Sequence, residues 1–131
     1  MIHLETNIVI ALFRGNLKVA RKIATFKPDV AISAVVLGEL YYGANNSGRK
    51  LENLLKISNI CHFISVLDYD AKSAEKYGMI RQNLRQKGKP ASESDMQIAA
   101  HALSYEALLV TNNTKHFEHI EGLKLEDWLK D

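Results

Sequence analysis

The stretch GKPASESDMQIAAHALS, residues 88–104, predicts a loop that leads into a buried helix. Pro90 ends the preceding helix, because proline restricts the residue before it and cannot donate to the helical ladder. Ser92 is then a suitable N-cap, and an apolar run from 96 to 103 follows it. Asp95 lies three residues after this cap. It is either a capping-box acid favoured by the helix dipole or a functional carboxylate, and other segments must decide between them.

The composition is that of one globular domain, and we expect residues 1–131 to form it. With 47% hydrophobic and 24% charged residues, the chain is neither disordered nor membrane-embedded, and no apolar run approaches the roughly 20 residues of a membrane span. Met1 leads directly into a strand-like segment without a secretory signal, and the single Cys61 offers no disulfide or CxxC pair. These features predict a cytoplasmic protein. The net charge of +2 permits an RNA partner without requiring one.

Strands alternate with helices along the chain. The predicted strands are 1–5, 30–33, 62–67 and 107–111, with a short strand or tail over 123–129. The predicted helices are 8–13 (capped by Thr6 and Asn7), 17–26, 34–44, 49–58, a long helix from the Asp70 cap to Gln86 with an apolar stripe at Ala74, Tyr77, Ile80 and Leu84, and the helix after Ser92. This alternation predicts a three-layer α/β/α fold with a parallel central sheet and right-handed crossovers.

Three carboxylates converge at one edge of this predicted sheet, where parallel sheets bind their ligands. Glu5 ends the first strand, and Glu39 lies about one and a half turns into the helix that leaves the second strand. Asp95 opens the helix that returns to the fourth strand, so it lies at the same edge. The polar turn at 111–113 leaves the fourth strand there too.

Glu39 is surrounded in sequence by apolar residues, and the helix 34–44 is apolar almost all round, so we expect Glu39 to be buried. An unpaired buried carboxylate costs several kcal/mol and must be protonated, paired or coordinated. One solution is an ion pair with a cation such as Arg81. The other is a metal held by clustered carboxylates, and oxygen ligands without cysteine suit Mg²⁺ or Mn²⁺. Such a site performs phosphoryl chemistry.

The chain resembles the PIN domain family, and within it the VapC-type toxins of toxin–antitoxin pairs. The matching segments are LETN (4–7), ISAVVLGELYYGA (32–44), VLDYDA (66–71), GKPASESDMQIAAHAL (88–103) and LLVTNNTKHFEHIEGLKLEDW (108–128). The resemblance implies a Mg²⁺- or Mn²⁺-dependent endoribonuclease whose metal-binding acids correspond to Glu5, Glu39 and Asp95. It also implies a structured RNA substrate, tRNA in particular, a VapB-like antitoxin that covers the site, and a homodimer or a toxin–antitoxin hetero-oligomer.

The chain departs from the family pattern at the site itself. The first acid is normally Asp, and here it is Glu5. The fourth, less constant acid falls in the turn after the fourth strand, where this chain has Asn113 and His116. Ser92 and Ser94 replace the usual Gly and Asn before the third acid. We therefore expect Asn113 to act as a polar assistant and Glu5 to attenuate the activity.

Other functions are weighed against this hypothesis. A degenerate toxin would keep antitoxin or RNA binding without turnover, and a phosphoacceptor receiver domain would need a paired acid and a lysine at strand ends, which are not apparent. A basic face formed by Lys72, Lys76, Arg81, Arg85 and Lys89 is either an RNA contact or a solvated helix face. His116 and His119 have the spacing of a metal pair but no third ligand. We expect His101 to be structural, with both ring nitrogens satisfied, and Tyr41, Tyr42 and Trp128 to be core or interface residues.

Overall fold

The computed structural model of the protein describes residues 1–130, which form seven α-helices, one short 3₁₀ helix and five strands. In chain order these are β1 (Ile2–Leu4), α1 (Thr6–Phe13), α2 (Leu17–Phe26), η1 (Lys27–Asp29), β2 (Val30–Ser33), α3 (Ala34–Asn45), α4 (Lys50–Phe63), β3 (Ser65–Leu67), α5 (Ala71–Lys87), α6 (Glu93–Ser104), β4 (Leu108–Val110), α7 (Thr114–Phe117) and β5 (Lys124–Glu126).

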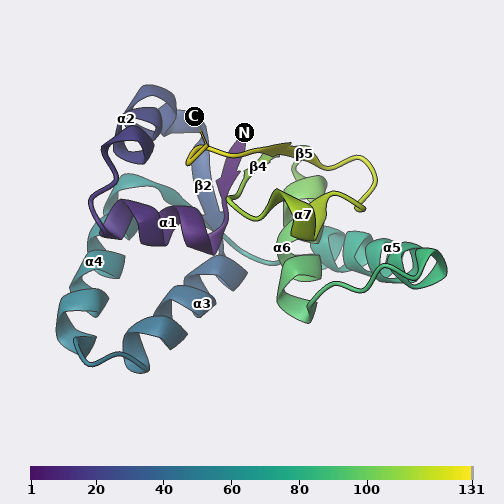
Figure 1. The fold of residues 1–131 in the computed structure, drawn as a ribbon, viewed down its shortest axis with the longest axis horizontal. Helices are drawn as coiled ribbons and strands as arrows, with labels where there is room; N and C mark the ends of the chain where they lie inside the picture. Colours follow the sequence, from purple (N-terminus) through teal and green to yellow (C-terminus); the bar gives the residue numbers. More distant parts are fainter. Residues whose placement is uncertain (131) are drawn as a thin grey trace.

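All five strands pair in parallel, in the order β3-β2-β1-β4-β5. The central strand β1 aligns Ile2 with Val30 of β2 on one side and with Leu108 of β4 on the other. Figure 1 shows α1 to α4 gathered on one side of these strands and α5 to α7 on the other. The predicted α/β/α fold with a parallel central sheet is confirmed.

The strand order reverses between β1 and β4. From β1 the chain moves outward through β2 to β3, then returns to place β4 on the other side of β1. In open parallel sheets, the connections that leave the two strands at such a reversal run in opposite directions, and the crevice between them, outside the carboxyl ends of the strands, binds ligands. The fold therefore points to the ends of β1 and β4 as the place to look for a site.

Local capping signals fix the helices that carry this edge. Asp70 caps α5, because its Oδ1 accepts the N–H of Ser73 at 3.0 Å, and Ser92 caps α6 by accepting the N–H of Asp95 at 3.1 Å. Gly88 ends α5 with a left-handed φ of 65°, and its N–H donates to the carbonyl of Arg85. The predicted stop at Pro90 is therefore made two residues earlier, by glycine.

Several predicted elements differ from the structure, including the helix predicted over 49–58, which continues to Phe63. The strand predicted over 62–67 is only Ser65–Leu67, because α4 continues to Phe63, where the Ile64 N–H still donates to the carbonyl of Ile60. The stripe predicted on α5 is also shifted. Ser73 is buried there instead of Ala74, which is exposed, while the predicted Ile80 and Leu84 are buried as expected.

The core lies on both faces of the sheet and includes the side chains of Leu4, Ile32, Leu109 and Trp128, each at most 1% exposed. Trp128 is thus a core residue, as predicted. Within residues 1–130, none of the helices combines the length and apolar character that crossing a bilayer requires.

The prediction that α3 is buried on most faces is wrong. Only Val36, Leu40 and Ala44 are buried, at the four-residue spacing of a single stripe. Tyr41 and Tyr42 are 41% and 72% exposed, so neither is a core residue. The face opposite the stripe is open, and Glu39 lies at its border as a half-buried residue.

Candidate active site

Glu5 connects β1 to α1 and is only 6% exposed. Its backbone is extended, and its Oε2 accepts the N–H of Asn7 at 2.8 Å, so Glu5 itself is the N-cap of α1. The prediction that Thr6 and Asn7 cap this helix is wrong. The helix begins at Thr6, two residues earlier than predicted, because the Glu5 carboxylate accepts an N–H of the first turn.

Burial raises the pKa of the Glu5 carboxyl above its ordinary value. The hydrogen bond from the Asn7 N–H opposes this shift, while the charges of Glu39 and Asp95 add to it and His116 reduces it. All three of these groups are therefore close enough to Glu5 to influence its ionisation. A cation placed among them would favour the charged form of Glu5.

Glu39 is held by two hydroxyl groups. Thr6 Oγ1 donates to its Oε1 at 2.5 Å, and Ser94 Oγ donates to its Oε2 at 2.7 Å. These bonds come from α1 and α6, so Glu39 is the point where three helices meet. The alternative of an ion pair with Arg81 is wrong: Arg81 lies 3.6 Å from Glu93 and pairs with that residue.

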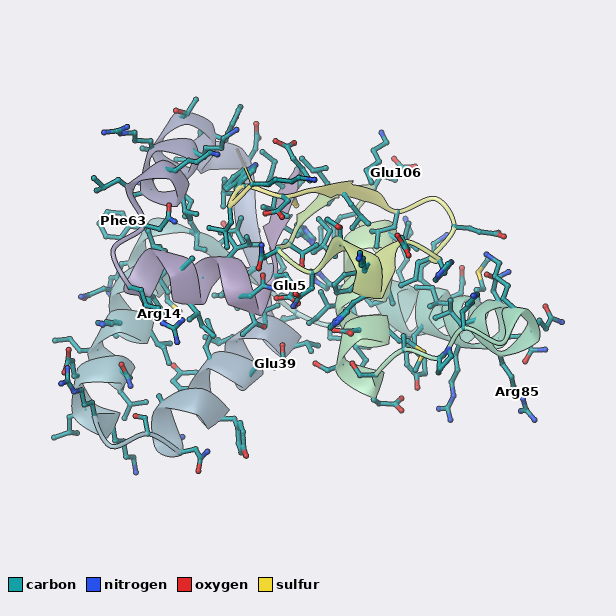
Figure 2. The ribbon with its side chains drawn as sticks, in the orientation of Figure 1. Glu5, Arg14, Glu39, Phe63, Arg85 and Glu106 are labelled. Carbon is teal, nitrogen blue, oxygen red and sulfur yellow. The ribbon has the colours of Figure 1, made fainter. Side chains whose placement is uncertain are left out.

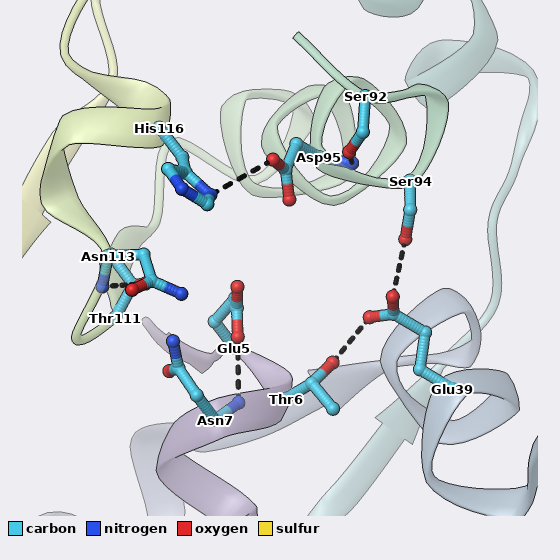
Figure 3. Close-up of polar contacts among 10 residues, drawn as sticks. All are labelled: Glu5, Thr6, Asn7, Glu39, Ser92, Ser94, Asp95, Thr111, Asn113 and His116. Carbon is cyan, nitrogen blue, oxygen red and sulfur yellow. Dashed lines mark hydrogen bonds and ion pairs between the residues drawn. The ribbon is translucent and has the colours of Figure 1, made fainter. Parts of the chain in front are cut away.

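Asp95 projects from the first turn of α6 with a side chain that is 18% exposed. Its Oδ2 lies 3.5 Å from Nδ1 of His116, which stands on the short helix α7. Ser92 caps α6 by accepting the N–H of Asp95. The Asp95 carboxylate takes no part in this cap and faces His116 on α7 (Figure 3).

Asparagine side chains complete the edge at the ends of β1 and β4. Asn7 Oδ1 accepts the N–H of Asn112 at 3.3 Å, which ties α1 to the loop after β4. The Asn113 N–H donates to Oγ1 of Thr111 at 3.0 Å and holds that loop in place. Asn7 Nδ2 is a buried donor without a hydrogen-bond partner among the described residues. A buried donor of this kind normally has a partner, so it marks a place where an acceptor fits.

The structure brings the four residues predicted for the site to one place. Glu5, Glu39, Asp95 and Asn113 surround a common space at the carboxyl ends of β1 and β4 (Figure 3). Figure 2 shows Glu5 and Glu39 near the middle of the molecule, between α1 and α3. We call this group of four residues the acidic rim, and His116 lies beside it.

The acidic rim is not a preformed metal cage. Within residues 1–130, no three His, Cys, Asp or Glu side chains are gathered closely enough to hold an ion as they stand. Its carboxylates are nevertheless the oxygen donors that hard divalent cations prefer, and no lysine or arginine in the described part of the chain pairs with Glu5, Glu39 or Asp95. Rotation of side chains toward an ion could therefore complete a site.

Sequence reasoning missed the roles of three neighbours of these acids. Thr6 and Ser94 were expected as a cap and as a replaced family residue, and they hold Glu39 instead. His116 was expected as a replacement for the fourth acid and was weighed as half of a metal pair with His119, and it faces Asp95. The available signal was positional, since Thr6 and Ser94 each adjoin a predicted acid in the chain.

Residues set apart from the site by the sequence mostly lie apart from it in the structure. Arg85 lies at the far end of α5, away from Glu5 and Glu39 in Figure 2. His119 pairs with Glu118 at 3.6 Å. His101 is buried and structural, but only its Nε2 has a partner, the Asp68 carbonyl at 3.1 Å; its Nδ1 has none within the described chain, so that prediction is half wrong.

Residues 2–123 match the PIN domain family. The chain is 40% identical over 126 residues to the tRNA(fMet)-specific endonuclease VapC of Shigella flexneri, covering 95% of this chain and 96% of that protein. Among solved structures, VapBC2 from Rickettsia felis bound to a DNA fragment from its promoter matches with a TM-score of 0.92 and 36% identity, over 98% of this chain and 99% of that one. DNA-bound VapBC from Salmonella typhimurium matches with a TM-score of 0.92 and 34% identity, over 97% of each chain.

Proposed function

The chain belongs to the PIN domain family, among the VapC ribonucleases, and from this premise we propose that it is a metal-dependent endoribonuclease toxin of a toxin–antitoxin pair. The observation that carries the proposal is the acidic rim. Three acids face one space at the reversal of the strand order, Glu5 from the connection between β1 and α1, and Glu39 and Asp95 from α3 and α6. Glu5 is 6% exposed and has a raised pKa. Such an arrangement costs stability unless a cation binds there.

Glu5, Glu39 and Asp95 are the residues that would hold the cation, and their oxygen donors fit Mg²⁺ or Mn²⁺. The orphan donor on Asn7 supports the same site, because it needs an acceptor such as a phosphate oxygen or a water molecule. When bound, the cation would activate water and neutralise charge on a phosphodiester.

The chain's own residues position the reacting groups. Thr6 and Ser94 fix both oxygens of Glu39, which limits the directions from which Glu39 can bind an ion. Asn7 Nδ2 and the Asn113 amide face the same space and would donate to the substrate phosphate (Figure 3). Hydrogen-bond donors held in place before the reaction stabilise developing negative charge without further reorganisation.

The substrate that we propose is tRNA. Two of the similar proteins, from Shigella flexneri and Salmonella typhimurium, are tRNA(fMet)-specific endonucleases. The acidic rim needs a cation to accept a polyanion, and the exposed bases of a structured RNA loop would be accessible to it. We place this activity in the cytoplasm, where tRNA is found.

The partner that we propose is a VapB-like antitoxin, since the similar solved structures are VapBC complexes. A groove of about 280 Å³ begins at Glu39 and runs between α1, α3 and α4. Its lining combines apolar Ile10 and Phe13 with the cations Arg14 and Lys56. A peptide in this groove would reach the acidic rim and could bring a cationic side chain to it. The assembly would be a toxin–antitoxin hetero-oligomer or a toxin homodimer.

One observation favours a second function, that of a degenerate toxin that binds antitoxin or RNA without cleaving it. Oε2 of Glu5 is committed to capping α1, and no three potential ligands of residues 1–130 are gathered as they stand. An RNase with its first acid displaced would keep its shape and its binding surfaces.

The experiment that separates these functions uses purified, antitoxin-free protein incubated with total RNA. We expect discrete fragments with Mg²⁺ or Mn²⁺ and none with EDTA. Binding of RNA without cleavage under every metal condition would support the degenerate toxin and contradict the nuclease. Fragments that persist in EDTA would contradict the metal site.

A further inference from the structure

We propose that His116 is a ligand of the metal in the acidic rim, and that this nitrogen donor makes the site prefer Mn²⁺ to Mg²⁺. The inference rests on the proposed function, because it concerns the same ion. It assigns to this histidine a role that the three carboxylates leave open, namely the choice between metals.

The position of His116 is built into the fold. It stands on α7, which packs against α6, the helix that carries Asp95. The next residue, Phe117, is fully buried and anchors α7 in the core, while the His116 side chain is 58% exposed and turned to the rim. A side chain that is free to move on an anchored helix can approach an ion without disturbing the core.

The distance between His116 and Asp95 fits two ligands of one ion better than a hydrogen bond. Nδ1 and Oδ2 are 3.5 Å apart, which exceeds the usual range of about 2.7–3.2 Å for an N–H···O bond. Two donors that are each about 2.1 Å from an ion, at roughly a right angle or somewhat wider, lie about 3.0–3.5 Å apart. Figure 3 shows the His116 ring directed at the Asp95 carboxylate, beside the space that Glu5 also borders.

His119 is a second histidine close to His116 in the chain, but its ring faces a different acid. It lies three residues further on, and its Nε2 faces Glu118 at 3.6 Å. Its side chain is 46% exposed, close to the 58% of His116. The two imidazoles therefore differ in whether they face the acidic rim, which makes His119 the matched control.

The mixed donor set determines the choice of metal. Mg²⁺ is a hard ion that takes oxygen ligands and water, so it gains little from an imidazole. Imidazole suits first-row transition metals, and carboxylates suit Mn²⁺ as they suit Mg²⁺, so Mn²⁺ accepts both kinds of donor. Three carboxylates with one histidine should therefore bind Mn²⁺ more tightly than Mg²⁺, and removal of the imidazole should weaken Mn²⁺ selectively.

The test is pulsed electron paramagnetic resonance of the Mn²⁺-loaded protein, together with calorimetric titration of Mn²⁺ and Mg²⁺. We expect the nitrogen-14 hyperfine signal of a coordinated imidazole in the parent and in His119→Gln, and its loss in His116→Gln. We expect His116→Gln to weaken Mn²⁺ binding by about tenfold or more and Mg²⁺ binding by less than about threefold. His116→Glu should bind both ions and show no nitrogen signal.

Each contrary result has a distinct meaning. The first case is that the parent binds Mn²⁺ and Glu39→Gln weakens this binding. If the parent then shows no nitrogen coupling, or if the coupling survives in His116→Gln, His116 is not a ligand and the proposed nuclease site stands. If the parent binds no Mn²⁺ at all, the assignment of His116 and the proposed metal site both fail. Unchanged thermal unfolding of His116→Gln without metal would show that the variant is folded.

Discussion

Thr6 Oγ1 donates a hydrogen bond of 2.5 Å to Oε1 of Glu39, and this bond joins the first turn of α1 to the middle of α3. Thr6 directly follows Glu5, so one short segment supplies one acid of the rim and orients another. Hydrogen bonds that orient ligating carboxylates are part of a metal site even when their donors do not touch the ion.

Thr6→Val keeps the shape of the threonine side chain and removes only the hydroxyl. We expect metal affinity to fall about 10- to 100-fold, because Glu39 loses one of the two bonds that direct it. The free energy of unfolding should fall by only about 1 kcal/mol. Thr25→Val is the control, since its hydroxyl bonds to the Arg21 carbonyl, away from the rim. Unchanged affinity in Thr6→Val, measured by calorimetry, would show that the bond does not position Glu39.

Glu5→Asp should raise the metal-dependent cleavage rate by about tenfold or more. Aspartate can still cap α1, but it is one methylene shorter and returns its carboxylate toward the strand end. Mg²⁺ tolerates little departure from octahedral geometry, and misplacement by about an ångström can cost on the order of 10²-fold. Equal or lower rates in this variant, with saturating Mg²⁺ and with Mn²⁺, would mean that Glu5 is already well placed.

Glu5→Gln should stabilise the metal-free protein at neutral pH. The pKa of Glu5 is higher in the folded than in the unfolded chain. The free energy of unfolding therefore falls as pH rises from the unfolded pKa through the folded pKa, because Glu5 becomes charged in a buried place. The variant should therefore melt higher than the parent at pH 7.5, and the difference should vanish below about pH 4. Added Mn²⁺ should raise the melting temperature of the parent more than that of the variant. Exposed Glu75→Gln is the control; if it matches Glu5→Gln, burial is not the cause.

His3 should make the fold sensitive to acid. Burial lowers its pKa to about 3, with the neighbouring His101 and the N-terminal ammonium contributing. The rings of His101 and Tyr105 face it at 4.9 and 5.3 Å between centroids. Burial also lowers the pKa of His101, and the hydrogen bond with the Asp68 carbonyl and the charge of Asp70 partly oppose this shift.

The unfolded chain binds a proton at His3 near pH 6.5, whereas the folded chain does so only near pH 3, so stability is complete above pH 6.5 and falls below it. His3 alone should lower the free energy of unfolding by about 1.4 kcal/mol for each pH unit below 6.5. Urea unfolding from pH 7.5 to 5 should show a shallower decline in His3→Leu than in the parent. If stability declines with pH as steeply in His3→Leu as in the exposed control His62→Gln, a neutral buried His3 is refuted.

Much of the fold and the location of the rim could be predicted because local signals were strong. Asp70 and Ser92 cap their helices as expected, and parallel topology then brings the ends of β1 and β4 together whatever the details of packing. The position of each acid relative to a strand end was enough to predict that Glu5, Glu39 and Asp95 would meet.

The remaining features depend on contacts that no local pattern contains. The apolar run before Leu67 has no clear period, so the end of α4 at Phe63 could not be separated from a strand. The exposure of Tyr41 and Tyr42 depends on which helices cover α3. The direction of His116 depends on the burial of its neighbour Phe117 among core residues that are far away in the sequence. These are tertiary effects that override local propensity.

We propose that the acids of the rim form a metal-dependent nuclease site, and substitution of single acids tests this. The most direct measurement is cleavage of tRNA with saturating Mn²⁺ by Glu39→Gln and Asp95→Asn, each made in the Glu5→Asp background to widen the measurable range. Glu93→Gln is the control, since Glu93 lies in the same helical turn as Asp95 but pairs with Arg81. We predict that both rim variants lose on the order of 10²-fold or more in rate while their melting temperatures stay near the parent's, and that Glu93→Gln cleaves normally. If either rim variant cleaves as fast as the Glu5→Asp protein in which it is made, the acids of the rim do not form the nuclease site.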